Sequence, residues 1–173
     1  MPRGKRRVFV GLYFRQGITA NPDSTSLNHA RFHWAICVEP KRSDDYGTCY
    51  EVKEEDVYVN IPGSGGWRYY CIEEHTPMLI GRIMVGKLPP GVLAMDVEWE
   101  LREVPLPREG AVPLENCVSW TERALGVLQA RGWVEEFDVK EFMEYARDRA
   151  TAWFEKGVYP GKVSKENYTQ RPM

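Results

Sequence analysis

The chain has 173 residues, which is enough for one domain with a sizeable core. An apolar content of 43% and a formal net charge of −2 argue against a disordered chain and against general binding of polyanions. The sequence contains neither an apolar run of about 18 residues nor a signal-peptide pattern, so we expect a soluble, cytoplasmic protein. In that compartment we expect its cysteines to be free thiols. They are Cys37, Cys49, Cys71 and Cys117.

The N-terminal segment begins with a basic stretch. Residues 1–7 include Arg3, Lys5, Arg6 and Arg7, and we expect them to form a solvated arm, with nucleic-acid binding as the alternative. Residues 8–14 are almost continuously apolar, which predicts a strand buried on both faces. Residues 16–28 are rich in Gly, Pro, Asn and Ser and predict a long loop. A loop of this length is often functional, so we expect it to border a site.

Two strands with alternating patterns follow, over residues 31–38 and 48–53. Alternation places His33 and Ala35 on one face of the first of these strands. If the two strands pair as a hairpin, Glu51 faces the same side as His33. This geometry would give the imidazole a carboxylate neighbour.

Further strands are predicted at residues 67–73 and 78–88, after a short apolar alternation at 57–61. The glycines of residues 62–66 lack the Gly-Lys-Ser/Thr ending of a phosphate-binding loop, so we interpret them as a hairpin turn. No cysteine pair has Cys-x-x-Cys spacing, and we expect neither a metal site nor a cofactor.

The C-terminal half predicts three helices and a tail. The first helix is predicted over residues 92–104, the second begins at Cys117 and stops before Gly132, and Asp138 caps the third, which Gly157 ends. The apolar stripe of the first helix is Leu93, Val97 and Leu101. Residues 158–173 are polar and predict a tail on the surface. We find no domain boundary, so residues 1–173 form a single predicted domain.

Cys117 is the strongest candidate for a reactive side chain. Asn116 is a favourable N-cap, which places Cys117 in the first turn of a helix. The free N–H groups and the positive end of the macrodipole there favour thiolate over thiol. The alternative is a small buried hydrophobe that closes the helix start. With His33 as base and Glu51 to orient it, Cys117 would complete a catalytic set for acyl chemistry.

Several short motifs resemble those of the circularly permuted papain-like superfamily, which includes permuted NlpC/P60 enzymes, lecithin:retinol-acyltransferase-like (LRAT-like) proteins and PPPDE-like peptidases. His33-Trp34-Ala35 is similar to their His-Trp-Ala strand, and Asn116-Cys117 to their helix start. The order of motifs is closest to that of a group of small uncharacterised fungal proteins with His-Trp-Ala and Asn-Cys-x-Ser-Trp. In this chain the motifs lie, in that order, at residues 33–35, 47–50, 67–69, 86–87 and 116–120. Where that group tends to have a histidine after the tyrosine, this chain has Glu51.

The resemblance implies an α+β, papain-like fold, with an antiparallel sheet and the Cys117 helix packed on it. It implies a thiol-dependent hydrolase or amide-forming acyltransferase that acts on a small-molecule, acyl or peptidyl substrate. Trp34, Asn116 and Trp120 belong to the shared motifs, and we expect them to bind substrate. Two alternatives stay open. One is an aminoacyl-tRNA-dependent cyclodipeptide synthase of fungal secondary metabolism, in which the basic arm would contact tRNA. The other is a binding module that has kept the fold and lost the chemistry.

Overall fold

The computed structural model describes residues 5–41, 46–55, 66–74, 77–157 and 159–173. The predicted alternation at residues 57–61, the turn at 62–66 except for its last residue, and residues 1–4 of the basic arm lie outside this part of the chain.

The described residues form an α+β domain with one mixed sheet of six strands. The strands are β1 (Arg7–Tyr13), β2 (His33–Glu39), β3 (Tyr46–Glu54), β4 (Trp67–Glu74), β5 (Leu79–Lys87) and β6 (Ser164–Asn167). The helical elements are the 3-10 segment η1 (Pro22–Arg31) and the α-helices α1 (Ala94–Arg102), α2 (Cys117–Ala130) and α3 (Val139–Glu155). The strand order is β4-β3-β2-β1-β5-β6, and only the β5–β6 pair is parallel.

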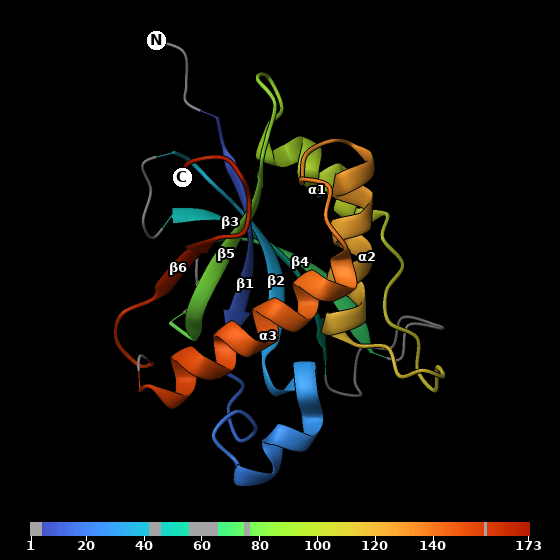
Figure 1. Ribbon diagram of the computed structural model, residues 1–173. Helices are drawn as coiled ribbons and strands as arrows, with labels where there is room; N and C mark the ends of the chain where they lie inside the picture. The colour runs from blue at the N-terminus through green and yellow to red at the C-terminus, as the bar shows by residue number, and fades with distance from the viewer. Residues whose placement is uncertain (1–4, 42–45, 56–65, 75–76, 158) are drawn as a thin grey trace.

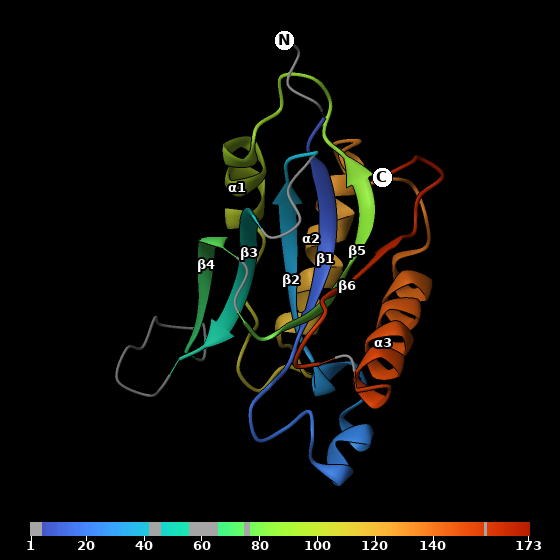
Figure 2. The same cartoon turned by 90° about the vertical axis from the view of Figure 1, so that its left-hand side faces the viewer.

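The three α-helices lie on one side of the sheet (Figure 1). In the view of Figure 2, the strands therefore lie in front of α2. Residues 8–13 of β1 are all buried, as their almost continuous apolar sequence predicts for a central strand, and Arg7 is buried as well. Val8, Val10 and Leu12 pack into the core on the helical side. On the other face, Phe9 and Tyr13 belong to a smaller buried cluster. The sheet is therefore packed on both faces.

The C-terminal segment corrects the prediction of a surface tail and of a purely antiparallel sheet. Residues 164–167 form β6, which pairs in parallel with Gly81–Met84 of β5. Its only acidic residue, Glu166, accepts a hydrogen bond from Arg149 Nε of α3 at 2.8 Å. The residues of β6 are polar and only partly buried. An edge strand held by main-chain hydrogen bonds and an ion pair has no hydrophobic alternation, so its sequence does not reveal it.

Several element boundaries also differ from the prediction. The basic arm ends before Arg7, which begins β1 and donates from Nη1 to the carbonyl of Lys41 at 3.0 Å. The predicted loop at 16–28 includes the first residues of η1, and Arg31 ends η1 instead of starting β2. Leu93 is the N-cap of α1 and is 49% exposed, so it does not belong to the buried stripe of that helix.

The C-terminal end of α2 is fixed to the sheet at Gly86 of β5. A Cβ at Gly86 would lie 2.4 Å from the carbonyl oxygen of Trp133, in the segment that follows α2. In the same segment, the N–H of Glu135 donates to the carbonyl of Val85 at 3.0 Å. Gly132 has φ of 69° and ends α2, as predicted. The close approach of the two backbones thus requires glycine at position 86.

We expect Gly86→Ala to lower the free energy of unfolding by about 1–3 kcal/mol, because a backbone carbonyl must move to admit the methyl group. Gly126→Ala is the matched control, since a Cβ there meets no atom within 4 Å. It lies inside α2 and should stabilise the protein by up to about 1 kcal/mol. Urea unfolding of both variants measures the difference, and equal effects would contradict the close approach.

Among the described residues, no helix is both long enough and apolar enough to cross a membrane.

Candidate thiol active site

Cys117 is the first residue of α2, and the residue before it fixes the helix start. Asn116 Oδ1 accepts a hydrogen bond from the N–H of Val118 at 2.9 Å, and Ser119 Oγ accepts one from the N–H of Asn116 at 2.9 Å. These reciprocal bonds form a capping box. Within the described part of the chain, the N–H of Cys117 has no acceptor among the hydrogen bonds of the helix cap. That N–H remains available to a ligand beside the thiol.

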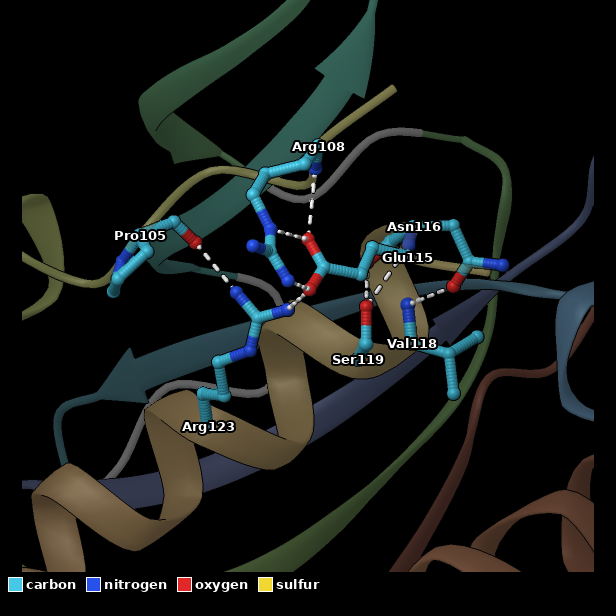
Figure 3. A network of polar contacts seen from close by, with 7 residues as sticks. All are labelled: Pro105, Arg108, Glu115, Asn116, Val118, Ser119 and Arg123. Carbon is cyan, nitrogen blue, oxygen red and sulfur yellow. Dashed lines mark hydrogen bonds and ion pairs between the residues drawn. The ribbon is translucent and has the colours of Figure 1, made fainter. Parts of the chain in front are cut away.

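The loop that leads into α2 is held by Glu115 (Figure 3). Its Oε1 lies 3.0 Å from Nη2 of Arg108 and 2.9 Å from Nη2 of Arg123. Nη1 of Arg123 donates to the carbonyl of Pro105. Its Oε2 accepts from the backbone N–H of Arg108 at 2.8 Å. The hydrogen bonds from Arg108, followed by the one from Arg123, lower the pKa of Glu115 to about 2. The ionised carboxylate therefore joins the loop to the first turns of α2.

His33 begins β2, at the end of the sheet where β2 and β3 separate. The ladder between these strands runs from Val38 to the pair Ile36–Tyr50. One residue beyond Tyr50, the carboxylate of Glu51 reaches the imidazole, with Oε2 2.6 Å from His33 Nε2. The predicted shared face is confirmed, and so is the carboxylate as the neighbour of the imidazole. With Nε2 engaged by Glu51, Nδ1 is the ring nitrogen left for another partner.

Glu51 is buried and has a second cationic neighbour. Its Oε1 lies 2.7 Å from Lys53 Nζ, on the same face of β3. Burial raises the pKa of Glu51, but hydrogen bonds and charges from His33 and then Lys53 outweigh it and lower that pKa overall. The carboxylate therefore stays ionised between two cations.

The thiol of Cys117 and the imidazole of His33 interact, and each shifts the pKa of the other. Burial raises the pKa of Cys117, but the hydrogen bond and charge of His33 and the backbone N–H of Trp34 lower it overall. Burial lowers the pKa of His33, but Cys117 and Glu51 outweigh it and raise this pKa to about 9. These opposite shifts favour a thiolate beside an imidazolium.

A pocket of about 700 Å³ opens at this pair. Cys117, His33 and Asn116 line it, so these three predicted site residues are brought together. The other lining residues are Arg15, Ile18, Leu27, Ala30, Val52, Lys53, Glu54, Trp67, Arg108, Glu109, Gly110, Leu114 and Glu115. Ile18 and Leu27 confirm that the segment at 16–28 borders the site.

Trp34 and Trp120 do not line the pocket, which corrects the expectation that they bind substrate. Both side chains are fully buried. The indole N–H of Trp34 donates to the carbonyl of His29 at 2.8 Å, and the ring of Trp120 lies 6.0 Å from that of Tyr69. Alternation already places Trp34 on the face opposite His33, so its side chain belongs to the core. Only its backbone N–H reaches the thiol.

The other cysteines lie in strands, as predicted, and their surroundings are different. Cys37 and Cys49 are opposite each other on β2 and β3, with Sγ atoms 3.1 Å apart. Burial raises the pKa of Cys37 well above its ordinary value. Burial followed by the charge of Glu98 raises the pKa of Cys71 to about 11. Neither environment favours a thiolate.

The fold and site define an α+β protein with a cysteine–histidine–glutamate cluster at the start of a helix. The chain belongs to a family of unknown function, DUF6914, which matches residues 5–172. No curated protein and no solved structure matches the chain.

Proposed function

We propose that this protein is a thiol-dependent acyl-transfer enzyme with a circularly permuted papain-like arrangement. The observation that carries the proposal is the contiguous set of Cys117, His33 and Glu51, in which the pKa of the thiol is lowered and that of the imidazole is raised. A core cysteine without a catalytic role would have its pKa raised by burial, as Cys37 has.

In the proposed reaction, the thiolate of Cys117 attacks the carbonyl carbon of an ester, thioester or amide. The C=O π electrons move to the oxygen, which accepts a hydrogen bond from the N–H of Cys117. When the carbonyl re-forms, the bond to the leaving group breaks, and His33 Nδ1 donates a proton to that group. The products of this half-reaction are a thioester on Cys117 and a neutral imidazole.

The thioester is then attacked by water or by an amine. Neutral His33 takes a proton from this nucleophile, and the thiolate leaves, which restores the ion pair. Water gives a hydrolase and an amine gives an amide-forming transferase. Glu51 holds the imidazole in the tautomer that leaves Nδ1 toward the thiol and stabilises the imidazolium charge.

Alkylation of Cys117 by iodoacetamide across pH tests this proposal against a binding module. The thiolate should persist at pH values well below the ordinary cysteine pKa of about 8.5, because His33 stays protonated up to about pH 9. Alkylation should therefore begin in mildly acidic solution. In His33→Ala the imidazolium is lost, burial dominates, and the midpoint should move to higher pH by more than one unit.

Peptide mapping identifies the alkylated cysteine in the same experiment. Cys71 is the internal control, because it is exposed and its pKa is about 11. Alkylation of Cys71 before Cys117 at neutral pH, or one midpoint shared by the wild type and His33→Ala, would favour the binding module.

A further inference from the structure

Arg15 contributes a cation to the wall of the Cys117 pocket and is fixed at both of its ends. Its backbone N–H donates to Oγ1 of Thr19 at 2.8 Å. At the other end of the side chain, Nη1 donates to the carbonyl of Ala30. The side chain therefore connects the start of the segment between β1 and β2 to Ala30, near the end of that segment.

The segment that carries Arg15 is itself well ordered around Thr19, which is fully buried. Thr19 Oγ1 donates to the carbonyl of Arg31 at 2.8 Å, and the carbonyl of Thr19 accepts from Ser24 Oγ at 3.1 Å and from Arg31 Nε at 3.2 Å. These bonds within the segment define its shape. The position of Arg15 is thus organised by the chain's own hydrogen bonds.

Arg15 differs from the other cations that line the pocket. Lys53 is paired with Glu51, and Arg108 is paired with Glu115. Within the described ranges, Arg15 has a carbonyl partner but no carboxylate within ion-pair distance. A guanidinium has five N–H donors, and one carbonyl leaves most of them available for a carboxylate or a phosphate. The charge of Arg15 also contributes to the lowered pKa of Cys117, which places the two groups within electrostatic reach.

We propose that Arg15 is a specificity-determining residue that binds an anionic group, a carboxylate or a phosphate, of the acyl donor. This inference rests on the proposed acyl-transfer function and names the class of its substrate. The rest of the donor would contact the apolar side of the pocket, where Ile18, Leu27 and Leu114 are at least partly exposed. The preferred substrate is therefore an amphiphilic acyl compound with a negative charge near its reactive carbonyl.

Two alkylating reagents of nearly equal size test this inference. Iodoacetate carries a carboxylate and iodoacetamide carries a neutral amide in the same place, and both transfer their methylene carbon to the thiolate with loss of iodide. In the wild type, the ratio of the iodoacetate rate to the iodoacetamide rate at Cys117 should exceed that of glutathione. Arg15→Gln should lower this ratio by about tenfold, because a charge-assisted hydrogen bond to the reagent is lost. Arg15→Lys should lower it less.

Competition distinguishes the two kinds of anion. Inorganic phosphate and acetate are added separately, and the one that slows iodoacetate more strongly identifies the preferred group. Neither should slow iodoacetate in Arg15→Gln. The matched control is Arg68→Gln, which removes an equal charge next to Trp67 from a guanidinium already paired with Glu55 at 3.0 Å. Its ratio should equal that of the wild type.

Two results would overturn the role of Arg15 while leaving the thiol chemistry intact. One is an equal slowing of both reagents in Arg15→Gln, which would mean that Arg15 acts only on the thiolate. The other is an equal change of the ratio in Arg68→Gln, which would mean that net charge alone decides it. By contrast, a Cys117 that iodoacetamide does not label below the ordinary cysteine pKa would contradict the proposed function itself.

Discussion

Cys117→Ala is expected to abolish acylation of the protein by an activated ester such as p-nitrophenyl acetate. The thiolate of Cys117 is the nucleophile of the proposed mechanism, and none of the described residues that line the pocket has a hydroxyl group to take its place. Loss of the nucleophile should reduce the rate at least about 10³-fold, to the background of the buffer. The burst of p-nitrophenolate and the mass of the acylated peptide measure this loss directly.

The control for this experiment is Cys71→Ser, which removes an exposed thiol with a raised pKa and should leave the burst unchanged. NMR titration of His33 provides an independent readout. In Cys117→Ala the hydrogen bond and negative charge of the thiolate disappear, so the pKa of His33 should fall from about 9. A burst that survives in Cys117→Ala would place the acylated group elsewhere.

The parts of the site that the sequence predicted follow from local rules. Alternation with a period of two put His33 and Glu51 on one face once their strands were paired, and the hydrogen bond of 2.6 Å agrees with this. The capping preference of Asn116 placed Cys117 at the start of α2. Both features depend on residues within a few positions of one another, or on neighbouring antiparallel strands. These are the interactions that sequence patterns record best.

The parts that the sequence did not predict depend on contacts between distant segments. Arg15 and Arg108 both line the pocket, but only Arg108 is paired with Glu115. No local sequence pattern predicts that pairing. The parallel strand β6 leaves no apolar signature because it is a polar edge strand. The side chain of Trp120 is fully buried, although its motif suggested substrate binding. Helical periodicity marks a buried stripe, but it does not say whether the core or a ligand covers it.

Glu51→Gln is the second change with a large expected effect, because it tests the residue that departs from the pattern of the resembling fungal group. The amide keeps the size of the side chain and can still bond to the imidazole, but it no longer stabilises the imidazolium charge. Burial should then dominate, so the pKa of His33 should fall and that of Cys117 should rise. We expect acylation at neutral pH to slow by about 10²–10⁴-fold. The rate of the p-nitrophenolate burst and the iodoacetamide midpoint measure both effects.

The same loss of activity could come from a damaged fold, so stability is measured alongside it. Glu51→Gln weakens two charge-assisted contacts, to His33 and to Lys53, but the amide can still form hydrogen bonds, so the change should cost no more than about 3 kcal/mol of unfolding free energy. Its effect on acylation should therefore appear in a fully folded protein, as judged by circular dichroism and urea unfolding. Glu73→Gln makes the same chemical change at an exposed position of β4 and should leave the acylation rate and the iodoacetamide midpoint unchanged. A folded Glu51→Gln variant with the wild-type rate and midpoint would show that Glu51 does not act through His33, and the proposed triad would then reduce to a Cys117–His33 pair.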